Sequence, residues 1–247
     1  MALPVLRTRL ARVTACLCMA ILTGLTQPVH AESIVTFEDA QPDKTFYRAI
    51  ACGARPGGKC KNAFATWPEE KRDNLTVAIV FTDPSFDPKM HKHIKKNLRS
   101  ATREINRAKA DVKLRMVNDS DPDIRVYLVP LAESAKTKAV QGTPDKSVNG
   151  RTFGQHQIAR VDVFWSSPSR NSPTGEITRA DIVFTSRMER GETKSVALEE
   201  LTQALGLLTD VDGPYYQMRS IFAENGNYVT KLTGQDVMVL RTHYPAR

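Results

Sequence analysis

The 247-residue chain lacks the patterns that would assign an enzyme class directly. It has no glycine-rich phosphate loop, no Ser-His-Asp order and no cysteine in a nucleophile context, and no internal repeat is visible. The usual signals for nucleotide-binding enzymes, serine hydrolases and cysteine hydrolases are therefore missing. Evidence about function has to come from local groups of residues.

Acidic residues are absent from the first 31 positions, and a basic head there contains Arg7, Arg9 and Arg12. The apolar run at 16–25 is shorter than the roughly 20 residues that a membrane-spanning helix needs. The stretch 29–31, Val-His-Ala, has the small-residue pattern that signal peptidase recognises. We therefore predict a signal peptide at residues 1–31, cleaved after Ala31. The mature protein would then be periplasmic or secreted, without a transmembrane segment. The alternative is an uncleaved membrane anchor.

Cysteine is scarce. Of the four cysteines, two belong to the predicted signal peptide, which leaves Cys52 and Cys60 in the mature chain. An even pair in an oxidising compartment, separated by a short Gly/Pro-rich stretch, predicts a local disulfide. Such a bridge contributes about 2–3 kcal/mol by restricting the unfolded chain. A redox or metal role is disfavoured, because neither cysteine belongs to a C-x-x-C pair.

The charge is only mildly basic. The chain has 35 Lys+Arg and 27 Asp+Glu, a net charge of +8. The predicted signal peptide takes three arginines and no acidic residue with it, so the remaining 216 residues carry +5. This charge is well short of that of a typical nucleic-acid binder. The length suits one domain, which we place at residues 68–247, preceded by an N-terminal extension at 32–67.

The hydrophobic pattern predicts an α/β (α+β) fold. β-branched apolar runs predict four strands, at residues 75–81, 124–129, 159–165 and 177–184. The last two alternate apolar and polar residues, as expected of strands with one face in water. Apolar residues at helical spacing predict a long helix over 89–109, which Asp87 and Pro88 begin. Together these elements predict a mixed sheet of about four strands with helices packed on it.

The long helix has a basic stripe made of Lys92, Lys96, Arg99, Arg103 and Arg107. Such a stripe is either a solvated face or a contact surface for an anionic envelope component. His91 and His93 lie two positions apart on this helix. They point to different sides of it and cannot chelate one metal ion together.

A second helix, predicted at about 194–208, carries the chain's most specific motif. Glu199 and Gln203 are four positions apart and therefore lie on one face. The stretch 199–210, E-E-x-x-Q-x-x-G-x-x-T-D, resembles the H-E-x-x-H-x-x-G-x-x-H-D zinc motif of metzincin peptidases. Glu200 matches the general-base glutamate, Gly206 the turn glycine and Asp210 the aspartate that follows the third ligand. The three zinc-ligand positions hold Glu199, Gln203 and Thr209 instead of histidine.

The C-terminal segment extends this resemblance. The stretch 232–240 together with Tyr244 is similar to the closing metzincin helix, and Thr233 and Asp236 are expected to cap that helix reciprocally. The stretch 220–222, Ser-Ile-Phe, has phenylalanine where the methionine turn of metzincins has methionine. The pattern E-E-x-x-Q-x-x-G-L-x-x-D also looks like a bacterial family of secreted proteins known only as a domain of unknown function. The resemblance implies a zincin-like (metzincin-like) fold with a degenerate active site.

Loss of three imidazoles should weaken zinc binding by many orders of magnitude, since neutral histidine is the usual donor in this motif. Without zinc, Glu200 has no activated water to deprotonate. We therefore expect no zinc or other cofactor, and an exported non-catalytic binding module whose partner is a protein or an anionic envelope component.

Three alternatives stay open. One is a peptidase-like hydrolase with a rebuilt metal or carboxylate site, in which Glu200 acts with Glu199 and with His156 or His243. Another is an envelope-associated structural protein that uses the basic helix. In the third, Glu199 and Gln203 are no more than solvent-facing residues of an amphipathic helix.

Overall fold

The computed structural model describes residues 27–30, 33–131, 138–140, 142–154, 157–167, 169, 172–226 and 228–246. Most of the predicted signal peptide, and its cleavage point at Ala31, lie outside the described residues. Within the described parts, no helix combines the length and the apolar character that crossing a bilayer requires.

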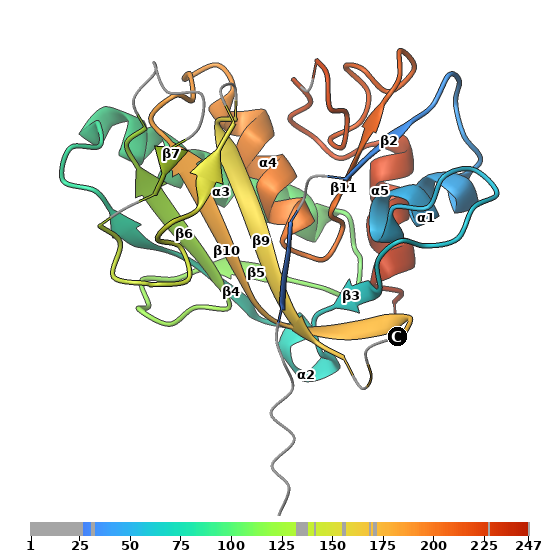
Figure 1. Cartoon of the computed structure of the whole chain (residues 1–247), viewed down its shortest axis with the longest axis horizontal. Helices are drawn as coiled ribbons and strands as arrows, with labels where there is room; N and C mark the ends of the chain where they lie inside the picture. Colours follow the sequence, from blue (N-terminus) through green and yellow to red (C-terminus); the bar gives the residue numbers. More distant parts are fainter. Residues whose placement is uncertain are drawn as a thin grey trace, which may run out of the picture.

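The α/β class is confirmed, and the main sheet is larger than expected. It has seven strands rather than about four, in the order β1-β9-β10-β6-β4-β5, with β3 paired to β10 (Figure 1). The strands are β1 (Gln27–His30), β3 (Phe64–Thr66), β4 (Leu75–Thr82), β5 (Leu114–Met116), β6 (Ile124–Val129), β9 (Ala159–Ser166) and β10 (Thr174–Thr185). The four predicted strands correspond to β4, β6, β9 and β10. The three unpredicted strands have three or four residues each, too few for an alternating pattern to identify them.

The sheet is mixed, as predicted. Strands β10, β6, β4 and β5 run parallel to one another, whereas β9 runs antiparallel to both β10 and β1. Strand β1 pairs with β9 only over positions 162–165. Among the described residues, no strand pairs with the part of β9 before residue 162 on the edge that β1 occupies further along.

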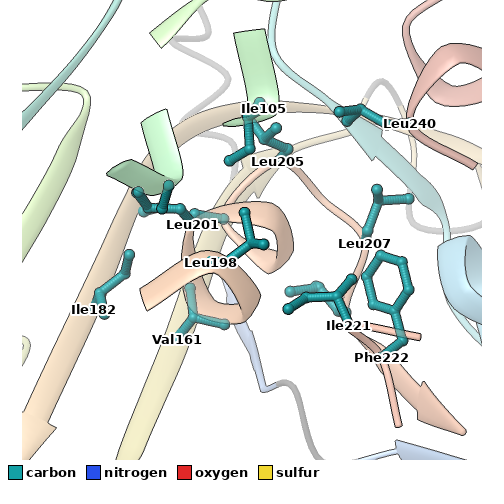
Figure 2. Packing of buried hydrophobic residues seen from close by; sticks show 14 of the residues in the cluster. Ile105, Val161, Ile182, Leu198, Leu201, Leu205, Leu207, Ile221, Phe222 and Leu240 are labelled. Atoms are coloured by element: carbon teal, nitrogen blue, oxygen red, sulfur yellow. The ribbon is translucent and has the colours of Figure 1, made fainter. Parts of the chain in front are cut away.

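Two helices pack together on one face of this sheet: α3 (Pro88–Arg107) and α4 (Thr193–Gln203). The predicted start of α3 is confirmed, because the Asp87 side chain accepts a hydrogen bond from the Lys89 amide at 2.9 Å. Leu198 and Leu201 of α4 pack in one cluster with Val161 and Ile182 of the sheet (Figure 2). Burial of such side chains contributes roughly 1.5–3 kcal/mol each, so α4 is held firmly on β9 and β10.

The opposite face of β9 and β10 is not the wet face that the alternating pattern predicted. Asp162 and Asp181 lie directly across from each other there, and both are fully buried. Three arginines neutralise this pair: Arg151 binds both carboxylates, Arg160 binds Asp162 and Arg179 binds Asp181. Arg151 comes from the segment 138–154, which contains β7 (Lys138–Ala139) and β8 (Thr152–Phe153). This segment adds apolar residues such as Val148 and Phe153 to a second hydrophobic cluster.

The remaining elements lie beside the sheet. They are β2 (Ser33–Thr36), α1 (Asp43–Cys52), α2 (Glu69–Arg72), β11 (Thr209–Asp212) and α5 (Gly234–His243). Strand β2 pairs in parallel with β11, and α1 packs against α5 and β11 (Figure 1). Phe46, Ile50 and Trp67, from the expected N-terminal extension, are buried in the same hydrophobic cluster as α4.

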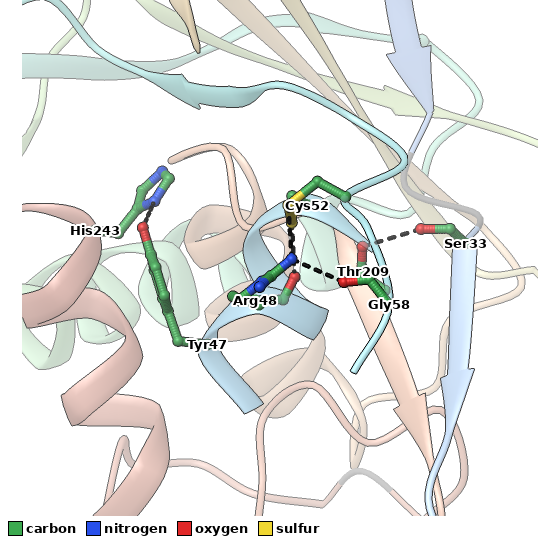
Figure 3. Close-up of a disulfide and its surroundings, with 8 residues drawn as sticks. Ser33, Tyr47, Arg48, Cys52, Gly58, Thr209 and His243 are labelled. Atoms are coloured by element: carbon green, nitrogen blue, oxygen red, sulfur yellow. Dashed lines mark hydrogen bonds between the residues drawn. A yellow bond between two sulfur atoms is a disulfide. The ribbon is translucent and has the colours of Figure 1, made fainter. Parts of the chain in front are cut away.

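The predicted disulfide between Cys52 and Cys60 is confirmed (Figure 3). It joins the end of α1 to the Gly/Pro-rich loop, where Arg48 donates a hydrogen bond to the Gly58 carbonyl at 2.9 Å. The bridge therefore fixes a loop beside α1.

Candidate functional site

Helix α4 ends at Gln203, five residues earlier than predicted. The chain turns sharply at Gly206, whose φ is +92°, and a Cβ there would lie 1.9 Å from the Ala65 carbonyl oxygen. Two side chains fix the turn: Trp67 Nε1 donates to the Ala204 carbonyl at 3.0 Å, and Tyr244 Oη donates to the Leu205 carbonyl at 2.7 Å. The chain then enters β11 at Thr209, so Asp210 is brought back beside α4.

The motif residues form two separate sets of contacts. Gln203 Nε2 donates a hydrogen bond to Asp210 Oδ1 at 2.8 Å. Thr209 Oγ1 lies 2.9 Å from Ser33 Oγ on β2 (Figure 3). The three positions that match zinc ligands therefore do not all face one point: Glu199 and Gln203 line a cleft, whereas Thr209 is bonded to the neighbouring strand. Among the described residues, no three His, Cys, Asp or Glu side chains are grouped so that they could hold a metal ion.

The cleft has a volume of about 650 Å³. Its walls are the edge of β9 with the residues just before it, helix α4, Asp210 on β11, and residues 223, 224, 226 and 228. Two large apolar residues on its wall are unusually exposed, Ile34 at 46% and Tyr228 at 61%. An open cleft with exposed apolar groups on its wall is typical of a binding site rather than of a packed interior.

The cleft is acidic although the whole chain is basic. Five of the lining residues are carboxylic acids: Glu192, Glu199, Glu200, Asp210 and Glu224. Arg160 is the single basic residue among the lining residues that the structure describes. Arg160 is itself buried and donates hydrogen bonds to Asp162 and to the Thr152 carbonyl. Its charge is therefore largely balanced from outside the cleft.

Glu200 is the most unusual of these acids. Its side chain is only 6% exposed, and its Oε2 atom has no hydrogen-bond partner. Burial raises the pKa of Glu200 well above its usual value; the nearby charges of Asp210 and Asp162 add to this, and Arg160 opposes it. Burial also raises the pKa of Asp210, helped by the charge of Glu224 and opposed by the Gln203 hydrogen bond.

His243, one of the two histidines that the hydrolase alternative could use, does not join these carboxylates. His243 Nε2 lies 2.9 Å from the Ala65 carbonyl oxygen, and its Nδ1 lies 3.3 Å from Tyr47 Oη (Figure 3). Burial lowers the pKa of His243 to about 4. His243 therefore supports the wall behind Gly206 and does not line the cleft. His156 lies outside the described residues.

The expected reciprocal cap of Thr233 and Asp236 is present only in half. The Asp236 carboxyl group is hydrogen-bonded to the Thr233 backbone amide, as expected, but the Thr233 side chain makes no cap. Asp236 also accepts hydrogen bonds from Ser220 Oγ at 2.7 Å and from the Ile221 amide at 3.1 Å. The buried amide and hydroxyl of the 220–222 segment share this carboxyl group, because a buried donor without a partner is costly. Asp236 thus links α5 to the segment 220–222 by hydrogen bonds.

Several cleft residues were not found from the sequence. Arg160 occurs in a predicted strand, but its alternating pattern was interpreted as a wet face. Glu224 and Tyr228 belong to a segment without periodicity, and Ile34 belongs to the predicted extension. Only the tertiary structure brings these residues to the motif on α4.

Comparison with known proteins gives one family. Residues 71–247 match the family described as "Protein of unknown function (DUF2927)". The chain is also similar to two solved structures described as "Structure of myroilysin" and "Crystal structure of myroilysin". The first is 15% identical, and the match covers 74% of this chain and 96% of that chain. The second is 14% identical, and the match covers 85% of this chain and 100% of that chain. Both have a TM-score of 0.35, at which neither likeness supports a conclusion about fold or chemistry. No curated protein matches significantly.

Proposed function

We propose that this chain, which belongs to the DUF2927 family, is an exported, non-catalytic binding module whose cleft holds an extended polypeptide segment. One observation carries the proposal. The residues at the three zinc-ligand positions of the motif make other contacts or are poor ligands, while the cleft beside them is open and lies at the edge of a strand. These contacts favour a cleft that binds a ligand over a cleft that holds a metal ion.

The donor set at these positions does not suit zinc. Catalytic zinc is held by three protein ligands that converge on one point, most often imidazoles. Here the Gln203 amide is bonded to Asp210, and the Thr209 hydroxyl is bonded to Ser33. Glu199 alone would offer a good donor. We therefore assign no zinc-dependent step to this cleft.

The proposed ligand conformation is supported by the sheet itself. Strand β1 adds antiparallel to β9 at positions 162–165, which shows that this edge accepts an extended chain. The cleft wall continues from there along residues 157–161. Cleavage after Ala31, as the sequence predicts, would remove β1 and free the whole edge. An extended segment would then gain main-chain hydrogen bonds from β9 and side-chain contacts from Ile34 and Tyr228.

The first test is binding of a synthetic peptide to the mature protein, residues 32–247. The probe is an acetylated, amidated peptide of alternating threonine and valine with one central lysine, titrated by calorimetry. Antiparallel addition places the amides of alternate residues toward the strand. We therefore expect that N-methylation of the amides that point toward the strand abolishes binding. N-methylation of the other alternate amides should leave the affinity unchanged. Equal effects of both sets would contradict strand addition.

The second test separates binding from catalysis. We expect the purified mature protein to contain no stoichiometric zinc by elemental analysis, and we expect the bound peptide to be recovered intact by mass spectrometry. Zinc at one ion per chain would overturn the proposal. If the protein cleaves the peptide and the Glu200→Ala variant does not, the result would support the hydrolase alternative instead. In that alternative, Glu199 and Glu200 act as an acid/base pair.

A second candidate role, association with the anionic cell envelope, is favoured by the surface of α3. Lys92, Lys96, Arg99 and Arg103 are exposed and form no ion pair with any described residue, whereas Arg107 pairs with Glu104. Each cation near an anionic membrane contributes about 1 kcal/mol. We expect the mature protein to sediment with phosphatidylglycerol vesicles at low salt, and the double variant Lys96→Glu/Arg103→Glu to stay in solution. Equal sedimentation of both proteins would exclude this role.

A further inference from the structure

We propose that Glu200 is the counter-ion for a primary ammonium group inside the cleft, with a lysine side chain of the bound segment as its source. This inference deepens the proposed function and rests on it, because it specifies which segments the cleft selects.

The first support is the state of Glu200 itself. Its Oε2 atom is shielded from solvent and has no hydrogen-bond partner, although the side chain lines an open cleft. A buried polar group without a partner is costly, so a native structure that keeps one calls for a specific explanation. The terminal torsion of a glutamate is broad, so either oxygen can turn toward a ligand in the cleft. A cationic donor that enters the cleft would satisfy this atom.

The second support is the sign of the surrounding charge. The cleft wall has four further acids and one arginine, which is bound to Asp162. Asp210, Asp162 and Arg160 are the charged groups that act on Glu200, and the two aspartates outweigh the arginine. Carboxylates gathered in a cleft favour a cation and repel an anion, and a buried carboxylate such as Glu200 interacts with a charge more strongly than it would in bulk water.

The geometry favours ammonium over guanidinium. Arginine binds a carboxylate most strongly as a planar fork that needs both oxygens of one group. The carboxylate beside Glu200 is already engaged, because Asp210 Oδ1 accepts a hydrogen bond from Gln203. An ammonium group is compact and has three donors that point in different directions. It can therefore use Glu200 Oε2 together with oxygens of neighbouring acids.

The test compares the lysine peptide described above with the same peptide carrying norleucine, which keeps the apolar stem and lacks the ammonium group. Hydrogen bonds to charged groups are stronger than neutral ones, so we expect the lysine peptide to bind about 10- to 100-fold more tightly to the mature protein. Glu200→Gln should reduce this ratio to near one. This substitution keeps the size of the side chain, and thermal unfolding would verify that the variant folds.

Glu70→Gln is the matched control, because it removes the same charge from an exposed acid that does not line the cleft. It should leave the preference for lysine unchanged. A third peptide, with norleucine and a free N-terminus, identifies the source of the ammonium group. If it binds as tightly as the lysine peptide, the ammonium assignment stands and the source is a chain terminus.

Two failures can be told apart. If the lysine and norleucine peptides bind the wild-type protein equally well, the ammonium assignment is wrong and the peptide-binding function stands. If neither peptide binds, the proposed function fails, and the inference that rests on it fails as well. The wild-type comparison needs no variant, so it decides the question even if Glu200→Gln does not fold.

Discussion

Glu200 and Asp210 are two neighbouring buried acids. Their ionisation destabilises the folded protein, because burial disfavours the charged form of each carboxyl group. Folding raises the pKa of both groups, so between the unfolded and folded pKa values the folded state binds more protons than the unfolded state. The contribution of these two groups to stability is therefore largest at acidic pH and falls as pH rises through this interval. Arg160 opposes the loss, while Asp162 and Glu224 increase it.

We predict that Glu200→Gln makes stability less dependent on pH. One proton accounts for at most about 1.4 kcal/mol per pH unit, so the variant should lose up to that slope. It should match the wild-type protein near pH 5 and exceed it near pH 8, as measured by urea unfolding at both pH values. A variant that is less stable than the wild-type protein at pH 8 would show that ionised Glu200 is stabilised by a contact within the chain.

Gly206 determines where α4 ends, and we predict that Gly206→Ala destabilises the fold by on the order of 3 kcal/mol. The methyl group would meet the Ala65 carbonyl oxygen at a backbone conformation that disfavours side chains. Gly150→Ala is the matched control, since Gly150 has φ +85° with open space around it. It should cost about 1 kcal/mol in urea unfolding, and similar losses for both variants would contradict the role of the close contact.

At the scale of whole elements, the sequence predicted the long regular parts and missed the short or irregular ones. Strands β4, β6, β9 and β10 and helix α3 have enough residues for a hydrophobic period to be visible. Strand β5, Leu114–Met116, has no period of its own and exists because β4 pairs with it. The predicted end of α4 at about 208 was wrong, because the apolar residues after Gln203 continue the helical spacing although the chain there turns and enters β11.

The candidate site was predictable only along one helix. The motif placed Glu199, Glu200 and Gln203 on a helix, and the structure puts all three on the cleft wall. The contact partners were not predictable, because Ser33 and Asp162 are remote in sequence from the motif. Local hydrogen-bonding rules also captured only part of the role of Asp236, since this residue binds tertiary partners in addition to the local Thr233 amide.

Two aromatic residues from opposite ends of the chain hold the turn after α4, and this predicts the effect of Tyr244→Phe. The Tyr244 hydroxyl donates to the Leu205 carbonyl and accepts from the Trp67 amide at 3.1 Å, and all of these groups are buried. Its removal takes a hydrogen bond from two buried backbone groups, so we expect a loss of about 2–3 kcal/mol in urea unfolding. Tyr47→Phe removes a partly buried hydroxyl and is the control, with an expected loss of about 1 kcal/mol.

At the scale of the whole molecule, the residues before the family match are part of the same core. The match begins at residue 71, yet Trp67 and Ala65 support the turn after α4, and Ser33 binds Thr209. The cleft is likewise assembled from both ends of the chain, since Ile34 and Tyr228 both lie on its wall. Residues that precede the family match therefore influence the cleft directly.

The pairing of β1 with β9 predicts how the expected cleavage after Ala31 affects binding. A chain that starts at Gln27 keeps β1, and a chain that starts at Glu32 lacks it, and the two differ by only five residues. Because an attached strand competes at an effective concentration in the millimolar range, the longer chain should bind the lysine peptide about tenfold more weakly or worse. Calorimetric titration of both chains measures this difference, with circular dichroism to verify that both are folded. Equal affinity would mean that the peptide does not use the edge that β1 occupies, and would move the proposed ligand away from β9.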